Sequence, residues 1–266
     1  MLARSSLPVS DKRKRIEFLI EFLKENRTIE MISLHLRAVR ALAKTMVVMA
    51  VSAGISFAQE KSVKPGINDT FKDPKIQEFV EKFEVESREV FLRRESIVAA
   101  CGIEEGCTLA DIGAGTGLFT RMFSKSVGKQ GRVISVDIAK NFLEHISKTC
   151  RDQDLRNVDT LLCSPDSTEL RESSIDFAFI CDTYHHFEFP TKTMKSLYRA
   201  MKPGGRLVVI DFKRIDGQST PWVLSHVRAG QSVFEQEIQE CGFVKRDQKL
   251  DILEENYFLL FQKPVP

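Results

Sequence analysis

The chain has 266 residues, 42% of them hydrophobic, which is enough for one large domain with a packed core or for two small ones. The formal net charge is only +2, and residues 1–58 carry ten Lys/Arg and five Asp/Glu, which leaves 29 and 32 for residues 59–266. A body with a net charge of −3 and no basic stripe is not typical of a nucleic-acid-binding protein.

The front of the chain divides into two segments. Residues 31–58 have a basic start, an apolar run and small residues at Ser56 and Ala58, which is the layout of a signal peptide with its cleavage site. This pattern predicts an exported or membrane-associated protein. The alternative is a helix packed on the domain of a cytoplasmic protein. Because a signal peptide does not begin thirty residues into a chain, we interpret residues 1–30 as a non-native, disordered or helical extension, with Met31 as a hypothetical true start.

The next stretch leads into the predicted main domain. Residues 59–74 are rich in Lys, Pro, Gly and Asp and predict a linker, followed by a domain over residues 75–266. From Lys75 to Cys101, apolar residues recur at spacings of three and four, which predicts one or two helices. Arg88 lies in this region and is interpreted either as a solvated charge or as a cleft residue.

The most informative stretch covers residues 109–120. An apolar run ends at Asp111, glycines alternate with other residues up to Gly117, and a helical pattern begins. This predicts a strand, a tight turn and a helix, since glycine allows positive φ and lets a ligand approach the backbone. A second predicted strand ends at Asp137, where nucleotide-binding βαβ units hold ribose hydroxyls.

The glycine spacing separates two nucleotide families. The dinucleotide fingerprint requires a third glycine at position 118, which is Leu118, and here the third glycine is Gly117. The D-x-G-x-G-x-G spacing from Asp111 instead resembles the class I S-adenosylmethionine-dependent methyltransferases (type 11/25-like), over roughly residues 75–263. The resemblance implies an α/β fold with a Rossmann-like seven-stranded sheet, order 3-2-1-4-5-7-6, strand 7 antiparallel and helices on both faces. It also implies S-adenosylmethionine as cofactor, bound by Asp111, Gly113, Ala114, Gly115, Thr116, Gly117, Asp137, Ile138, Asp166 and Cys181.

Asp166 follows the predicted third strand, Asn157 to Cys163. The resemblance implies that it lies near the adenine amino group. Asp is also at home in a turn after Pro165, and the two interpretations are equally supported.

The predicted fourth strand, residues 174–181, ends in a polar tip. Ligands of open α/β sheets bind beyond the carboxyl ends of the strands, so Asp182, His185 and His186 are the candidate catalytic residues. The His pair resembles a group of small-molecule methyltransferases that includes those of quinone biosynthesis. Methyltransferases that act on nucleic-acid bases carry Asn/Asp-Pro-Pro-aromatic here, and this chain does not. A structural role for both histidines is the alternative.

The rest of the chain completes an alternating pattern. Its predicted elements are a helix at Thr191–Met201 closed by Lys202-Pro203-Gly204-Gly205, a strand at Arg206–Phe212, a loop at 216–231 with Trp222 and His226, a helix at Ser232–Cys241, and strands at 243–249 and 257–263. Six cysteines form no recognisable disulfide framework, and because no Cys-x-x-Cys or His-rich spacing is present, the sequence predicts no metal site.

The resemblance implies SN2 transfer of the sulfonium methyl to a small-molecule acceptor, without nucleic-acid partners. Two other function classes remain open at this stage. One is a non-catalytic S-adenosylmethionine- or nucleotide-binding module, and the other is a nicotinamide-dependent oxidoreductase, which Leu118 disfavours. The sequence predicts neither the acceptor nor the oligomeric state.

Overall fold

The computed structural model describes residues 17, 21 and 61–266, of which Glu17 and Glu21 are helical and exposed. Apart from these two residues, the predicted extension (1–30) and the signal-peptide-like segment (31–58) lie outside the described residues and stay predictions. The chain separates into two units, Met1–Phe57 and Ala58–Pro266, and the fold below belongs to the second. In the described part, no helix has both the length and the apolar composition needed to cross a membrane.

One seven-stranded sheet runs through the second unit in the order β3-β2-β1-β4-β5-β7-β6, which confirms the predicted order. The five strands β3, β2, β1, β4 and β5 are parallel, whereas β7 is antiparallel to both β5 and β6. The strands are β1 (Thr108–Ile112), β2 (Arg132–Asp137), β3 (Val158–Leu162), β4 (Ile175–Cys181), β5 (Met201–Phe212), β6 (Val244–Lys249) and β7 (Asn256–Gln262).

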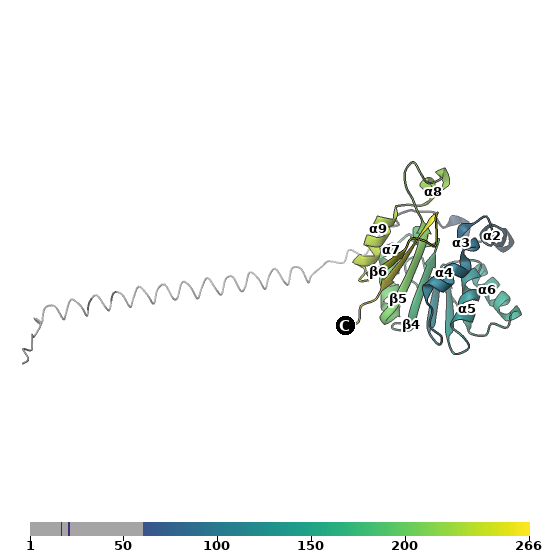
Figure 1. Ribbon diagram of the computed structural model, residues 1–266, viewed down its shortest axis with the longest axis horizontal. Helices are drawn as coiled ribbons and strands as arrows, with labels where there is room; N and C mark the ends of the chain where they lie inside the picture. The colour runs from purple at the N-terminus through teal and green to yellow at the C-terminus, as the bar shows by residue number, and fades with distance from the viewer. Residues whose placement is uncertain (1–16, 18–20, 22–60) are drawn as a thin grey trace, which may run out of the picture. The chain divides into compact units, whose positions relative to one another are not determined.

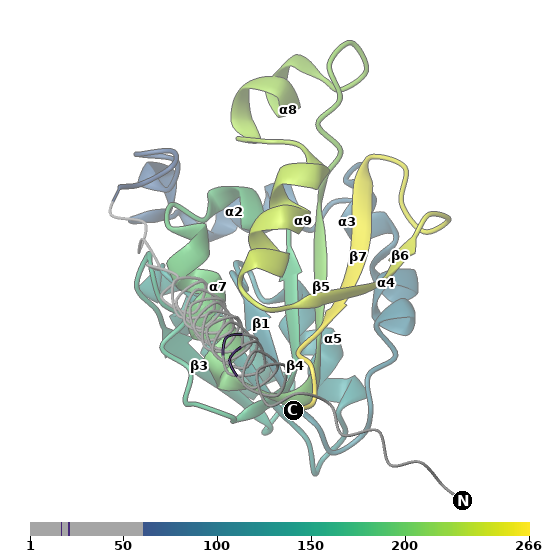
Figure 2. The ribbon, with the colours of Figure 1, turned by 90° about the vertical axis from the view of Figure 1, so that its left-hand side faces the viewer.

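Helices cover both faces of the sheet, as predicted. The helices described are η1 (Asp69–Phe71), α2 (Ile76–Phe83), α3 (Glu89–Leu92), α4 (Arg94–Cys101), α5 (Leu118–Ser126), α6 (Lys140–Asp152), η2 (Tyr184–His186), α7 (Pro190–Ala200), α8 (Pro221–His226) and α9 (Gln231–Glu240). Figures 1 and 2 show α7 and α9 on one face and α4 and α5 on the other.

The two faces have separate hydrophobic cores. Val208 and Val209 are adjacent in β5 and fully buried, yet Val208 packs with Phe123 of α5 in one core and Val209 packs with Phe234 of α9 in the other. Alternation along a strand sends neighbouring side chains to opposite faces. A parallel strand covered on both faces therefore needs a continuous apolar run, which explains the sequence Leu-Val-Val-Ile in β5.

Element boundaries differ from the predictions in three places. The region from Lys75 to Cys101 forms three short helices rather than one or two. The loop predicted at 216–231 contains α8. The Pro-Gly-Gly segment predicted to separate helix from strand lies inside β5, where the pairing with β4 shifts register between Ile175 and Phe177, so the strand tolerates the irregular backbone.

The predicted linker is part of the folded unit in its described portion. The side-chain amide of Asn68 donates a hydrogen bond to the backbone carbonyl of His186 at 3.0 Å, and the ring of Phe71 lies 5.3 Å from that of Phe79. The prediction of a linker was therefore wrong for residues 61–74. The linker prediction rested on the high content of Lys, Pro, Gly and Asp. The residues that attach this segment to the domain, Asn68 and Phe71, are single residues in the stretch and form no recognisable pattern.

Candidate active site

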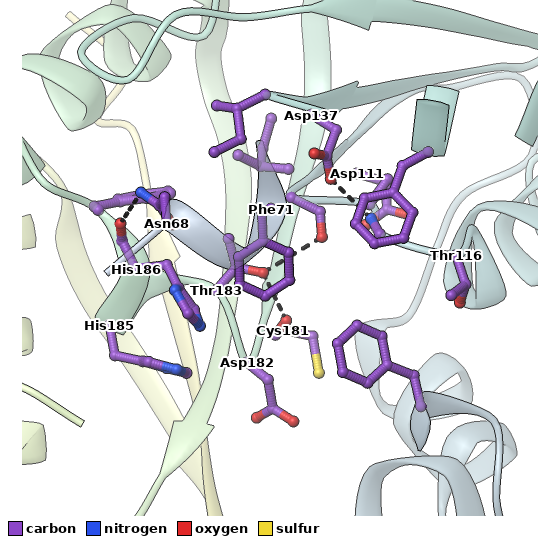
Figure 3. A pocket seen from close by; sticks show the side chains of 18 of the residues that line it. Asn68, Phe71, Asp111, Thr116, Asp137, Cys181, Asp182, Thr183, His185 and His186 are labelled. Carbon is purple, nitrogen blue, oxygen red and sulfur yellow. Dashed lines mark hydrogen bonds between the residues drawn. The ribbon is translucent and has the colours of Figure 1, made fainter. Parts of the chain in front are cut away.

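A cavity of about 630 Å³ opens at the carboxyl ends of β1, β2 and β4, with residues of α2 and α8 in its wall. This volume is within the range of small-molecule sites, and the position is where open α/β sheets bind ligands. Figure 3 shows Asp111, Thr116 and Asp137 on one side of the cavity and His185 and His186 on the other, with Asp182 and Thr183 between them.

The turn after β1 holds two glycines for different reasons. Gly113 and Gly115 both have positive φ, +71° and +53°, which favours glycine. A Cβ on Gly113 would lie 2.2 Å from Cγ2 of Thr183, so this glycine lets the tips of β1 and β4 approach each other. A Cβ on Gly115 would meet only Phe83, at 3.8 Å. Gly115 lines the cavity, so the missing side chain leaves free space for a ligand.

Two buried acids face this turn. The backbone N–H groups of Gly115 and Ala139 each donate to the Asp137 carboxylate at 2.9 Å, which fixes its orientation toward the cavity. Burial raises the pKa of Asp137, and the backbone donors oppose that rise. Asp111 accepts a hydrogen bond from the Thr120 hydroxyl at 2.6 Å, and burial raises its pKa to about 7.

Eight of the ten predicted cofactor residues line the cavity: Asp111, Gly113, Ala114, Gly115, Thr116, Asp137, Ile138 and Cys181. Gly117 is not among the lining residues, and a Cβ there would lie 2.6 Å from Cγ1 of Ile146, so this glycine packs the turn against α6. The Cys181 thiol is buried, which raises its pKa well above the ordinary value. All six cysteines are free.

The structure does not place Asp166 in the cavity wall. Its carboxylate lies 3.2 Å from Nζ of Lys192 and accepts a hydrogen bond from the Ser164 hydroxyl at 3.1 Å. The lysine contact, followed by the serine, lowers the pKa of Asp166. Its observed role is therefore that of a paired turn residue. The neighbours Ser164, Pro165 and Ser167 line the cavity in its place.

Asp182 anchors the tip of β4. Arg88 forms an ion pair with one carboxylate oxygen, and the Asn256 amide donates to the other at 2.6 Å. Burial raises the pKa of Asp182 and Arg88 opposes that rise. Because the Arg88 cation stabilises the ionised carboxylate and so opposes its protonation, the geometry does not support the predicted role of Asp182 as a catalytic base. Arg88 lines the cavity, so it is a cleft residue rather than a solvated charge.

His185 is held by a carboxylate that the sequence analysis missed. The residue is 1% exposed, and Nδ1 lies 2.7 Å from Oδ1 of Asp211, whose second oxygen accepts from the His185 backbone N–H at 3.0 Å. A carboxylate accepts only, so in the neutral ring Nδ1 is the donor and Nε2 keeps the lone pair. Among the described residues, that buried Nε2 has no hydrogen-bond partner.

His186 faces another histidine. Its Nε2 lies 3.3 Å from Nε2 of His226, which comes from α8, forty positions along the chain. Burial, followed by the neighbouring His185 and His226, lowers the pKa of His186 to about 2, and burial lowers that of His226 to about 4. A ring with a pKa of about 2 is too weak a base for proton transfer near neutral pH, so the geometry does not support the predicted role of His186 as a general base.

Aromatic rings form an apolar wall of the cavity. Phe79 of α2 is at the centre of this wall, with ring centroids 5.3 Å from Phe71, 5.2 Å from Phe83 and 5.4 Å from Phe142. Phe71 also meets His186 edge-on at 5.1 Å. We call Phe71, Phe79, Phe83 and Phe142 the aromatic wall. Phe79 and Phe83 are four residues apart on α2, so helical periodicity places them on the same face of the helix. Periodicity alone does not show that this face lines a cavity.

Residues 110–209 match the family model described as "Methyltransferase domain". The match covers the glycine turn, Asp137 and the polar tip of β4. Residues 110–209 therefore form a methyltransferase domain. A curated relative, the ubiquinone/menaquinone biosynthesis C-methyltransferase UbiE of Pseudoalteromonas translucida, is 30% identical over 124 residues, which are 46% of this chain and 49% of the relative. The chain thus spans about half the length of the curated relatives that it matches.

Solved structures of methyltransferases share the fold. A methyltransferase from Aquifex aeolicus, named as dependent on S-adenosylmethionine, superposes with a TM-score of 0.62 at 24% identity, covering 69% of this chain and 96% of that one. The [4+2]-cyclase SpnF superposes with a TM-score of 0.58 at 15% identity, covering 65% and 81%. Because a cyclase shares the fold, the fold of this methyltransferase domain does not by itself specify the reaction, which has to be argued from the site.

Proposed function

We propose that this methyltransferase domain transfers a methyl group from S-adenosylmethionine to a small apolar acceptor with a ring. The observation that carries the proposal is that the glycine turn, Asp137, the aromatic wall and His185 line the same cavity. S-adenosylmethionine supplies an electrophilic sulfonium methyl, which a nucleophile takes from behind. The chain's own residues have to bind both molecules, align them and exclude water.

The cofactor end of the cavity fits S-adenosylmethionine. The space beside Gly115 admits a ligand against the backbone. The Asp137 carboxylate, oriented by two backbone N–H groups at 2.9 Å, retains lone pairs for the ribose hydroxyls. Leu118, the first residue of α5, occupies the position where the dinucleotide fingerprint has glycine, which favours S-adenosylmethionine over a nicotinamide cofactor.

The aromatic wall supports an apolar acceptor. Phe71, Phe79 and Phe83 present ring faces and edges, which bind another ring favourably in offset or edge-on arrangements. The relative from Pseudoalteromonas translucida is named for ubiquinone and menaquinone biosynthesis, and this supports a hydroxylated ring as the acceptor class. The net charge of −3 over residues 59–266 argues against a nucleic-acid acceptor.

His185 is the proposed proton acceptor where the nucleophile carries a proton. Its Nε2 lone pair is unpartnered among the described residues, and Asp211 fixes the ring and would stabilise the imidazolium. Arg88 and Asp182 act differently, since their ion pair fixes the β4 tip from which His185 projects.

Methyl-labelled S-adenosylmethionine tests the proposal. The full chain is incubated with a hydroxylated arene bearing an apolar tail, with sarcosine, with tRNA and with a denatured protein. We expect label in the arene alone, and less of it with Phe79→Ala than with Phe243→Leu, a conservative core substitution outside the cavity. Label in tRNA or protein would contradict the acceptor class. Cofactor binding without transfer to any acceptor would favour the non-catalytic binding module.

A further inference from the structure

Three histidines from two parts of the chain meet in the cavity. His185 and His186 follow β4, and His226 ends α8. One ring nitrogen from each lies within 4.8 Å of one nitrogen of each of the other two. The sequence predicted no metal site because two of these histidines are adjacent and the third is forty positions away, a spacing that no short motif contains.

The geometry points to a binding site for a divalent transition-metal ion of the zinc class, held by one ring nitrogen each of His185, His186 and His226. Imidazole nitrogens are preferred ligands of such ions, and three protein ligands with one open position are the arrangement of catalytic zinc sites. In a tetrahedral site with bonds of 2.0–2.1 Å, two ligating nitrogens lie about 3.3 Å apart. The Nε2 atoms of His186 and His226 are separated by 3.3 Å.

The surroundings of His185 match those of a metal ligand. Its Nδ1 donates to Asp211 at 2.7 Å, so Nε2 keeps the lone pair, and among the described residues that buried atom has no hydrogen-bond partner. A carboxylate behind a ligating histidine is the usual second layer of a metal site, since it fixes the tautomer and raises the basicity of the ring.

The cluster is also enclosed by apolar rings. Each histidine ring contacts one aromatic ring, and the distances below are between ring centroids. Phe71 meets His186 edge-on at 5.1 Å, and Phe212 meets His185 edge-on at 5.8 Å. Trp222 stacks on His226 at 4.6 Å. These rings cover part of the cluster, and all three histidines line the cavity. Two cations oppose binding: Lys64 donates to the backbone carbonyl of His226, and Lys82 lines the cavity. Three neutral nitrogens with the Asp211 charge behind them have to outweigh these lysines.

Most of the ring geometry is already in place. All three ligand atoms lie within 4.8 Å of one another, so no separation exceeds the tetrahedral value by more than about 1.5 Å, a gap that small rotations of the rings would close. A bound ion would occupy the Nε2 lone pair of His185, so His185 would be the proton acceptor only in the metal-free chain. In the metal-bound chain, the ion would bind an oxygen of the acceptor at its open position and lower the pKa of that oxygen. That role rests on the proposed function, whereas metal binding itself does not.

Cobalt tests the site because four-coordinate Co²⁺ absorbs strongly in the visible range. The untagged full chain is stripped with a chelator and titrated with Co²⁺, then with Zn²⁺. We expect one Co²⁺ per chain with intense four-coordinate bands, and displacement by one equivalent of Zn²⁺. His226→Gln should weaken Zn²⁺ binding at least tenfold. His145→Gln should leave it unchanged, because His145 lies on α6 outside the cluster.

Two results would overturn the inference. One is the absence of stoichiometric Co²⁺ and Zn²⁺ binding by the wild-type chain, which decides the matter even where a variant fails to fold. The other is equal Zn²⁺ affinity of His226→Gln and wild type. Calorimetry of the metal-stripped chain with S-adenosylmethionine is a separate readout, because the glycine turn and Asp137 bind independently of the cluster. A failure of metal binding is thereby distinguished from a failure of the proposed function.

Discussion

A Cβ atom on Gly113 would lie 2.2 Å from Cγ2 of Thr183, whereas one on Gly115 would meet nothing closer than 3.8 Å. The two glycines of one turn therefore serve different purposes. Gly113 permits close packing between the tips of β1 and β4, and Gly115 leaves open space in the cavity.

Substitution by alanine separates these purposes. Both changes strain a backbone with positive φ, by about 1–2 kcal/mol. Gly113→Ala adds an overpacking penalty of about 1–3 kcal/mol, so its free energy of unfolding should fall further. Gly115→Ala should fold better and bind S-adenosylmethionine more weakly. Thermal unfolding and calorimetry measure both quantities. Equal stability of the two variants would contradict this account of the turn.

Asp137 and Asp166 form a matched pair of acids. Asp137→Asn keeps the size of the side chain but removes the charge facing the cavity, which should cost about 1.5–3 kcal/mol of S-adenosylmethionine binding. Asp166→Asn should leave the affinity unchanged, because Asp166 pairs with Lys192 outside the cavity wall. Calorimetric titration of both variants decides the point. A loss of affinity in Asp166→Asn would restore the predicted adenine contact.

The ion pair of Arg88 and Asp182 stabilises the fold around the site. Arg88→Met leaves a buried carboxylate without its cation and should lower the free energy of unfolding by about 2–3 kcal/mol, below the range for fully buried pairs because the Arg88 side chain is 26% exposed. The double variant Arg88→Met, Asp182→Asn should recover part of that loss, since the amide needs no cation. Urea unfolding of the cycle measures the coupling. Additive losses would show that the pair does not interact.

Asp111 gives stability a specific dependence on pH. Burial raises its pKa from 3.8 to about 7, so the folded chain binds a proton that the unfolded chain releases above pH 3.8. The stabilisation from this proton is complete below about pH 3.8 and is lost as pH rises through about 7. Wild type should therefore lose stability relative to Asp111→Asn between pH 4 and pH 7. Asp137 and Asp182 titrate in both proteins, so the difference reports on Asp111 together with its charge interaction with Asp137. Parallel stability curves would contradict the assignment.

The local motif and the family resemblance together predicted the sheet, and eight of the ten residues that they proposed for cofactor binding line the cavity. The strand, the glycine turn and the helix are formed by consecutive residues, so a local pattern predicts them, and Asp137 follows at a fixed distance. The resemblance supplied the strand order, which periodicity alone does not determine. Val208 and Val209 explain why the strands could be predicted. A strand that is buried on both faces has a continuous apolar run, which is visible in the sequence.

The part of the cavity around the histidines depends on contacts between distant residues. Three side-chain contacts join residues that are far apart in the sequence. Asp211 contacts His185, 26 positions away, and His226 contacts His186, 40 positions away. Asn256 contacts Asp182, 74 positions away. No local pattern encodes such contacts. Phe71 was missed for a different reason, because it is a single aromatic residue in a stretch whose composition is typical of a linker.

Binding of S-adenosylmethionine to the wild-type full chain, measured by calorimetry beside NAD⁺, tests the central claim most directly. The cavity beside Gly115 and Asp137 predicts one molecule of S-adenosylmethionine per chain and no measurable heat with NAD⁺. Absence of S-adenosylmethionine binding, or preferential binding of NAD⁺, would contradict the assignment of the site.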